Sequence, residues 1–417
     1  IMSESLTTTL PMIKNLKETD ILISGDAVSL AKDLCESLEL PTTKNEHWKY
    51  TRLNKLKNRE FNQNKATVEN LEDYIMTKDP KVVFVNGSYS HALSDEIQLD
   101  GVSITIYSEA TEPVELTLKE DNASLLSAIN LCYLTDGIDI KFTESNSKKT
   151  IQLIHILDGV DTLSNFRMSV NSANNSNGAI VVGFFSADNA SCFSNVNMDV
   201  NVGKNAHLII EKLQYENDST FHISEENINQ EQDSTFSINT ITLNGGLVRN
   251  DLYIAVNGGN STSNLNGAYI LNGKQHVDNH TIVDHRVANC DSNELYKGVI
   301  NGKATAVFNG KVFVRKDAQK INAFQSNGNV LLSEDATVNS KPELEIYADD
   351  VKCSHGSTTG QLDEEAVFYL KSRGISEDNA RQLLVSAFIG DVLNKIQNED
   401  LNKFIYTKIE ERFGWEF

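Results

Sequence analysis

The feature of this sequence that most constrains its fold is a long middle stretch built only of short β-type runs. From about residue 138 to about residue 354, runs of apolar and β-branched residues alternate with Asn, Gly, Asp and Ser. More than two hundred residues pass there without a convincing amphipathic helix. Sandwiches, propellers and β-helices are the architectures that accommodate so many short strands. The chain is therefore predicted to be mainly β.

Asparagines between the runs favour a parallel β-helix. Asn tolerates the left-handed backbone that β-helix corners need, and it can stack on the same residue type in the next coil. No propeller or lectin repeat motif is visible. The residues give no strict repeat period, so a pair of β-sandwiches stays open on pattern alone. The asparagines concerned are Asn171, Asn174, Asn175, Asn195, Asn197, Asn201, Asn260, Asn264 and Asn266.

Helical patterns flank the β stretch and predict three regions. Residues 1–137 are expected to be mostly helical with short strands, residues 138–357 to form the β-helix core, and residues 358–417 to form a C-terminal helical domain. Within the first region we predict helices over 68–76 and 124–134, and strands over 81–85 and 98–107.

The C-terminal region carries clear helix signals. Asp363 and Ser376 precede helical patterns as candidate N-terminal caps, and a further helical segment runs from 401 to 413. An apolar stripe indicates the core of a small helical domain, and we expect the β-helix to stay folded without 363–417. The stripe includes Leu383, Leu384, Phe388 and Val392.

Charge and cysteine content exclude several classes of function. The formal net charge of −21 repels a phosphate backbone, so no nucleic-acid partner is expected. Five dispersed cysteines form no C-x-x-C pair, which argues against a disulfide framework or a zinc ribbon. No signal-like N-terminal pattern and no apolar run of about 20 residues is visible. The prediction is a cytoplasmic protein without a membrane span.

Cys353 and His355 are the candidate metal-binding residues. In an extended segment, residues i and i+2 project from the same face, so a thiolate and an imidazole lie side by side. Both groups bind iron, and Gly356 allows the backbone to turn directly afterwards. One Cys and one His do not complete a metal site, however. From the residues alone, a packed Cys353 and a strand-end His355 explain the pair better.

Three histidines between 276 and 285 form a second cluster. Strict alternation places His276 and His280 on one face of a strand and His285 on the other. That parity argues against a single three-histidine site. A strand surface that packs against a partner is the better interpretation, and the nearby Cys290 is interpreted as structural.

No catalytic motif is visible. The Gly-Lys pairs do not occur in G-x-x-x-x-G-K-[ST], and neither G-x-S-x-G nor H-E-x-x-H occurs. The sequence therefore predicts a protein that is not an enzyme. A β-helix carbohydrate-active enzyme, a lyase or glycosidase, is the alternative, because Asp-rich loops can supply paired carboxylates.

Several motifs resemble the SufB/SufD family of iron–sulfur cluster assembly proteins. Glu46-His47-Trp48-Lys49-Tyr50-Thr51 matches the E-x-W-K-Y-T motif of the SufD branch. The match is nearly continuous from His276 through the last third of the chain. The region from 159 to 232 shares only the general pattern of short β-type runs. The match includes Gln325-Ser326-Asn327 and Lys341-Pro342-Glu343-Leu344-Glu345-Ile346. Its strongest piece is Asp350-Val351-Lys352-Cys353-Ser354-His355-Gly356, which runs into Gly360-Gln361-Leu362-Asp363.

The sequence resembles the SufD branch more than the SufB branch. SufB-like proteins carry a cysteine just before the proline that corresponds to Pro342. Here the preceding segment, 336–341, contains none. Where SufB has an E-H-E-A-T run, this chain has Cys353-Ser354-His355-Gly356-Ser357-Thr358.

This resemblance implies a right-handed parallel β-helix flanked by helical ends. It implies a scaffold subunit that pairs with a SufB-like paralogue and docks a SufC-like ABC ATPase through its C-terminal helices. His355 matches a histidine implicated at the SufB–SufD interface, and Cys353 follows it. No intrinsic cofactor is expected; a transient iron–sulfur cluster would form at that interface. Flavin binding, cluster type and homodimer formation by isolated chains are left open.

Overall fold

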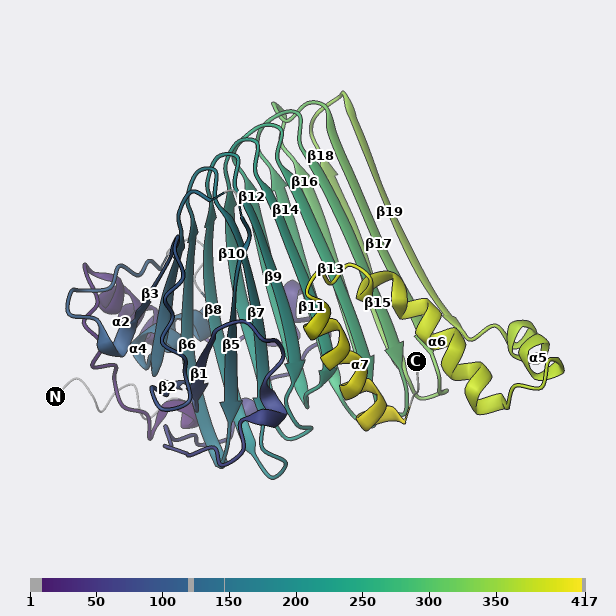
Figure 1. Cartoon of the computed structure of the whole chain (residues 1–417), viewed down its shortest axis with the longest axis horizontal. Helices are drawn as coiled ribbons and strands as arrows, with labels where there is room; N and C mark the ends of the chain where they lie inside the picture. Colours follow the sequence, from purple (N-terminus) through teal and green to yellow (C-terminus); the bar gives the residue numbers. More distant parts are fainter. Residues whose placement is uncertain (1–9, 119–123, 146, 415–417) are drawn as a thin grey trace.

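Two long parallel β-sheets dominate the computed structural model, which describes residues 10–118, 124–145 and 147–414 (Figure 1). The outermost parts of the predicted terminal regions, residues 1–9 and 415–417, lie outside the described residues. The chain winds back and forth between the sheets, so that consecutive strands of the coil belong to opposite sheets. This arrangement confirms the predicted parallel β-helix with helices near both ends of the chain.

One sheet has ten strands and the other has nine. The ten-stranded sheet consists, in spatial order, of β19 (Val351–Gln361), β17 (Ile321–Leu331), β15 (Asp291–Ile300), β13 (Thr262–Leu271), β11 (Thr235–Asn244), β9 (His207–Tyr215), β7 (Asn177–Ser186), β5 (Lys149–Leu157), β1 (Lys81–Val85) and β2 (Ser88–Tyr89). The nine-stranded sheet consists of β18 (Thr337–Ile346), β16 (Thr305–Val314), β14 (His276–His285), β12 (Leu247–Val256), β10 (Phe221–Gln230), β8 (Ser191–Val202), β6 (Val160–Ser172), β4 (Asp136–Phe142) and β3 (Val102–Ile106).

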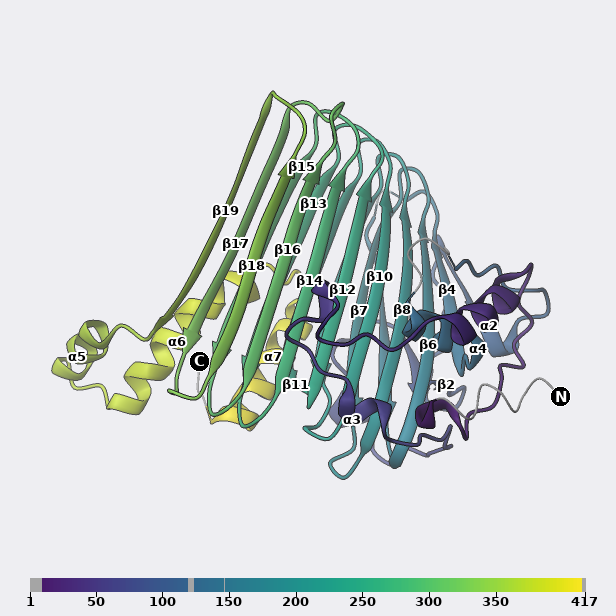
Figure 2. The same cartoon turned by 180° about the vertical axis from the view of Figure 1, so that it is seen from behind.

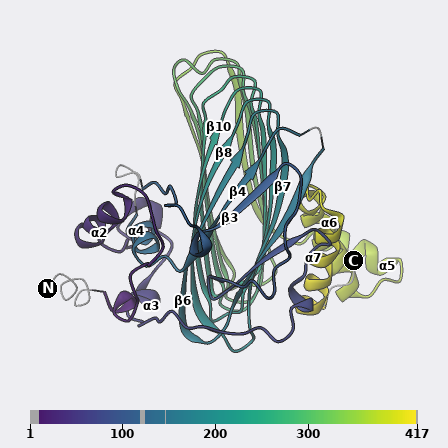
Figure 3. The ribbon, with the colours of Figure 1, turned by 60° about the vertical axis from the view of Figure 1, so that its left-hand side comes forward.

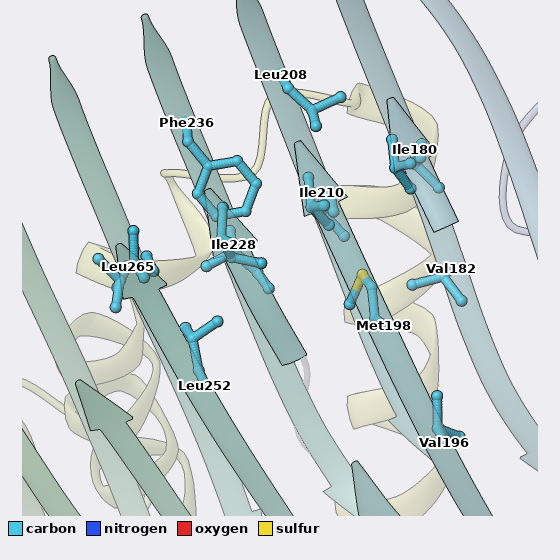
Figure 4. Packing of buried hydrophobic residues seen from close by; sticks show 14 of the residues in the cluster. Ile180, Val182, Val196, Met198, Leu208, Ile210, Ile228, Phe236, Leu252 and Leu265 are labelled. Atoms are coloured by element: carbon cyan, nitrogen blue, oxygen red, sulfur yellow. The ribbon is translucent and has the colours of Figure 1, made fainter. Parts of the chain in front are cut away.

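The strand register shows the repeat that the sequence alone did not give. Leu247 pairs with His276, and His276 pairs with Thr305, so each of these two coils takes 29 residues. Apolar residues on the inner faces of both sheets meet between them and form the core (Figure 4). Because the two sheets face each other closely, this core is long and thin.

Asparagines act at the corners and in ladders, as predicted. Asn175 and Asn260 adopt positive φ angles of 57° and 58° at corners of the coil. Within the strands, the amide of Asn201 donates to Asn171 over 3.0 Å, and that of Asn266 donates to Asn239 over 2.9 Å. Stacked side-chain amides therefore link successive coils.

The N-terminal region contains fewer helices than the sequence predicts. Its described α-helices are α2 (Ala27–Ser37), α3 (Asn54–Lys57) and α4 (Leu125–Cys132), together with the short 3-10 turns η1 (Pro11–Ile13), η2 (Glu46–Trp48), η3 (Glu72–Tyr74) and η4 (Tyr107–Glu109). The predicted helix over 68–76 is wrong, because only η3 forms there. The predicted strand over 81–85 is confirmed, and α4 begins at its Ser124 cap.

The C-terminal helices are α5 (Glu364–Ser372), α6 (Glu377–Leu393) and α7 (Glu399–Phe413), with Asp363 and Ser376 as caps. Helices α6 and α7 lie on the opposite side of the β-helix from the N-terminal helices (Figure 3). Ile389 and Val392 join Ala268 and Ile270 in one buried cluster on the outer face of the ten-stranded sheet. Removing 363–417 would expose that apolar face to solvent. The expectation that the β-helix stays folded without these residues is therefore not supported by the packing.

The sequence-based assignment does not include four strands, β6, β8, β10 and β2, whereas β19 contains the extended segment predicted around Cys353 and His355. The first three carry many buried polar residues, such as Asn165 and Asn195, which hides the apolar alternation. None of the helices in the described ranges has the length and apolar character that crossing a bilayer requires.

Candidate functional site

Cys353 and His355 lie on β19, the last strand of the ten-stranded sheet. Cys353 pairs in register with Ala323 and packs, half-buried, against the core between the sheets. Ser357 lies 2.7 Å, oxygen to oxygen, from Ser340 of β18 in the opposite sheet. Because alternate residues of a strand share a face, His355 points to the same inner side as Cys353 and Ser357. The predicted side-by-side placement is therefore present.

These side chains are accessible because the β-helix is open at this end. β19 is exposed along nearly its whole length, and β18 is only half-buried. Within residues 10–118, 124–145 and 147–414 no further coil follows β19, so its inner face meets solvent at this end. The predicted turn after Gly356 is wrong: β19 runs on to Gln361.

A buried polar group lies directly behind His355. His355 pairs in register with Gln325 of β17, and Gln325 pairs with Glu294 of β15. The Gln325 side-chain amide donates to the Glu294 carboxylate over 2.6 Å, and the Thr281 hydroxyl also donates to it. Burial raises the pKa of Glu294 to about 7, against smaller opposing effects of these two hydrogen bonds. Burial also raises the pKa of the Cys353 thiol.

The residues of this chain do not by themselves form a complete metal site. Among residues 10–118, 124–145 and 147–414, no group of three or more His, Cys, Asp or Glu side chains could hold an ion. A metal ion bound by Cys353 and His355 would therefore need further ligands from another molecule. Cys290, interpreted as structural, is buried in the core.

The three histidines of β14 follow the predicted parity. His285 lies on the inner side and contacts the Ser292 hydroxyl over 2.9 Å. His276 and His280 lie on the outer face, where His276 is 2.8 Å from the Thr51 hydroxyl and His280 is 2.9 Å from Asp278. The outer surface of β14 thus packs against the N-terminal segment of the same chain.

That contact is a clamp built by the E-x-W-K-Y-T motif. The Arg249 guanidinium of β12 lies 3.8 Å from the centre of the Trp48 ring and donates to the His47 carbonyl over 2.8 Å. It also donates to Asp278 over 2.7 Å. Burial alone would raise the pKa of Asp278, but Arg249 and hydrogen bonds from His280 and Thr51 lower it to about 2. The motif therefore holds the N-terminal segment across the nine-stranded sheet (Figure 2).

The C-terminal helices present a second candidate surface. Phe368 and Tyr369 of α5 are 73% and 56% exposed, and Leu383 of α6 is 48% exposed. The rest of the predicted apolar stripe is used internally: Val392 is buried, and Leu384 and Phe388 pack against the same cluster. Exposed aromatic and aliphatic side chains on adjacent helices are typical of a protein-binding surface.

Sequence reasoning missed three residues of these sites: Glu294, Gln325 and Arg249. Each is polar and almost completely buried, a combination that no local pattern reveals. Gln325 belongs to one of the quoted resemblance motifs, but its contact with Glu294 depends on strand register between coils. Arg249 depends on a contact with Trp48, about two hundred residues away in the sequence.

Comparison with known proteins gives a consistent result. Residues 155–388 match the family model described as "SUF system FeS cluster assembly, SufBD core domain". The chain is 32% identical over 389 residues to the iron–sulfur cluster assembly protein SufD of Escherichia coli, covering 89% of each chain. It is 29% identical over 415 residues to an iron–sulfur cluster assembly SufBD family protein of Synechocystis, covering 92% of this chain and 91% of that one.

Proposed function

Because this chain is a SufD-type member of the SufB/SufD family of iron–sulfur cluster assembly proteins, we propose that it is a non-catalytic scaffold subunit. It pairs through the open end of its β-helix with a SufB-like paralogue. It docks a SufC-like ABC ATPase through α5 and α6. The assembly acts in the cytoplasm, and the chain holds no resident cofactor.

The observation that carries this proposal is the uncovered last coil. Both end strands, β18 and β19, present a free edge, and β19 is exposed along nearly all of its length. Long exposed edge strands pair readily with other chains unless something covers them. A partner with the same two-sheet architecture can continue both sheets by adding strands to these edges. A paralogue of this chain has that architecture.

Pairing at this end would bring His355 to the interface as a ligand for a transient cluster. Neutral imidazole and thiolate both bind iron, and this chain lacks the cysteine that SufB-like proteins carry before the equivalent of Pro342. A thiolate from the partner together with His355 is the simplest shared ligand set. Cys353 has a smaller part in the proposal, because its thiol packs against the core.

The exposed Phe368, Tyr369 and Leu383 support the docking of an ATPase subunit. The chain has no phosphate-binding loop of the G-x-x-x-x-G-K-[ST] kind. Any ATP hydrolysis in the assembly must then come from another subunit. These three side chains are exposed apolar groups of the kind that such a subunit covers.

The alternative of a carbohydrate-active enzyme receives less support. Glycoside hydrolysis needs two carboxyl groups on either side of the bond that is cleaved. A cleft of about 830 Å³ lies beside the N-terminal segment, but Asp218 is the single acid among its described lining residues. Arg412 already pairs with Asp218 over 3.3 Å. The Lys and Arg side chains in its lining are Arg52, Lys55, Arg59 and Lys274.

The test is complementation of a strain that lacks this subunit. His355→Ala should leave folding and complex formation unchanged but abolish most cluster assembly, because a ligand is lost. Cys353→Ala should have the weaker effect. His207→Ala, which removes an exposed histidine at the start of β9, is the matched control. Full rescue by His355→Ala, with normal complex assembly in a pull-down, would contradict the assignment.

ATPase docking is tested separately on the intact chain. Replacing Phe368 and Leu383 together by Ser should abolish co-purification of the ATPase subunit, while the SufB-like subunit still co-purifies. The variant should melt as the wild-type chain does, because both side chains are exposed. Undiminished ATPase co-purification would exclude this surface.

A further inference from the structure

Three side chains on successive coils lead from the interior to the open end. Glu294, Gln325 and His355 pair in register across β15, β17 and β19. All three lie on the inner side of the ten-stranded sheet. Glu294 and Gln325 are 5% and 3% exposed, whereas His355 is exposed. The Gln325 amide therefore lies between a buried carboxyl group and an accessible imidazole.

The amide of Gln325 is held in one orientation. Its nitrogen donates to Glu294 over 2.6 Å, on the side away from β19. The group reaches over Gly310 of β16, where an added Cβ would lie 2.1 Å from the amide nitrogen. Gly310 thus leaves the space that the amide occupies. With one N–H of its amide donated to Glu294, the carbonyl oxygen of Gln325 remains available as an acceptor.

That carbonyl oxygen is buried and unsatisfied. Among the described residues, no group donates a hydrogen bond to Gln325 Oε1. A buried acceptor without a hydrogen bond lowers the free energy of unfolding by about 1–3 kcal/mol. It is therefore unfavourable unless another group donates a hydrogen bond to it. His355 on the adjacent strand has no hydrogen-bond partner within the same described ranges. A free acceptor and a free donor group therefore lie next to each other.

We propose that Gln325 is a positioning residue for His355. Its carbonyl oxygen accepts the N–H of the imidazole and directs the other ring nitrogen toward the partner subunit. A histidine that binds a metal through one nitrogen donates its remaining N–H to such an acceptor, which fixes the tautomer and the ring orientation. Glu294 acts one step further away by holding the amide nitrogen. This inference rests on the proposed role of His355.

The first test compares two substitutions of Gln325 in the complete complex. Gln325→Met keeps the length of the side chain but removes the acceptor, and should lower cluster assembly about 10-fold or more. Gln325→Glu keeps an acceptor and should retain more activity than Gln325→Met. Ser326→Ala, on the same strand but the opposite face, should behave as wild type. Wild-type assembly by Gln325→Met would overturn the proposal.

The second test measures the contact without any cluster. In the full chain labelled with ¹⁵N-histidine, the His355 resonances are identified by their loss in His355→Ala. In the wild-type chain the ¹⁵N shifts of the neutral His355 ring should show one dominant tautomer, whereas Gln325→Met should give a mixture of tautomers, because the acceptor is lost. An unchanged tautomer ratio in a normally melting Gln325→Met chain would overturn the proposal. If Gln325→Met does not fold, Gln325→Leu takes its place in this measurement.

The two experiments separate this inference from the proposed function. If His355→Ala assembles clusters normally, the role of His355 fails, whatever the ¹⁵N spectra show. If His355→Ala is inactive but the His355 tautomer ratio does not depend on Gln325, the role of His355 stands and the positioning role of Gln325 is wrong.

Discussion

The two ends of the β-helix differ in how they are closed. At the first coil, β1 is almost completely buried and β4 largely so, while β2 and β3 pair antiparallel to them and cover the edges. At the last coil, β18 is half-buried and β19 is exposed, and no strand in the described part of the chain covers either of them. Figure 1 shows this contrast between the two ends of the molecule.

This difference teaches that the fold is complete at one end and incomplete at the other. A free chain normally blunts or covers an edge strand because exposed edges promote association. Here only the edges of the first coil are covered. The residues that can bind iron, Cys353 and His355, lie at the end whose edges are open. Structural completion by a partner and assembly of a shared site would then be the same event.

The largest expected effect comes from removing Arg249, which holds the N-terminal segment against the nine-stranded sheet. Arg249→Ala should lower the free energy of unfolding by about 3–5 kcal/mol, because it leaves the buried Asp278 carboxylate without its cation. Arg315→Ala should cost less than about 1 kcal/mol, because Arg315 is half-exposed and Arg286 still pairs with Asp284. Chemical denaturation of both variants checks this; equal losses would contradict the clamp.

A second pair of substitutions compares the two ends directly. Ile140→Ala in β4 removes a side chain with 0% exposure and should lower the free energy of unfolding by about 2–5 kcal/mol. Leu344→Ala in β18 removes a half-buried side chain and should cost about 1 kcal/mol in the isolated chain. Denaturation curves measure both values. An equally large loss at Leu344 would mean that the last coil is already closed in the free chain.

A smaller, pH-dependent effect is expected at Glu294. Its pKa in the folded chain, about 7, lies above that of an unfolded Glu, about 4.3. The wild-type chain therefore loses stability as the pH rises through this window, and Glu294→Gln does not. Between pH 5 and pH 8, the free energy of unfolding of Glu294→Gln should rise by about 2.5 kcal/mol relative to that of wild type.

The measurement for Glu294 is thermal unfolding at several pH values. Glu410→Gln, an exposed substitution on α7, serves as the control for general pH effects. A constant difference between Glu294→Gln and wild type across the range would mean that the Glu294 carboxyl group is not desolvated as the structure indicates.

Much of the fold could be predicted because its signals are local. The repeated β-type runs, corner asparagines such as Asn175, and the caps Asp363 and Ser376 each depend on neighbouring residues. The strands β6, β8 and β10 were missed because polar ladders, such as Asn165 with Asn195, are buried there. The helix over 68–76 failed because its residues pack as an irregular segment against the β-helix.

The site was predictable only in part. The spacing of Cys353 and His355 places them on one face of a strand, and the resemblance marks them as a candidate pair. Their accessibility could not be predicted, since it depends on β19 being the last strand. The contact of Gln325 with Glu294 depends on register between coils about 30 residues apart, which no local pattern encodes.

The most direct test of the open end is binding of the full chain to its SufB-like paralogue. Strand alternation places Thr359 on the inner side of β19 with His355, and it is exposed. Thr359→Lys puts a charge where the next coil would stack and should weaken binding at least about 10-fold, while melting stays unchanged. Thr111→Lys, exposed near the closed end, should bind as wild type does. Wild-type affinity of Thr359→Lys would contradict pairing through the last coil.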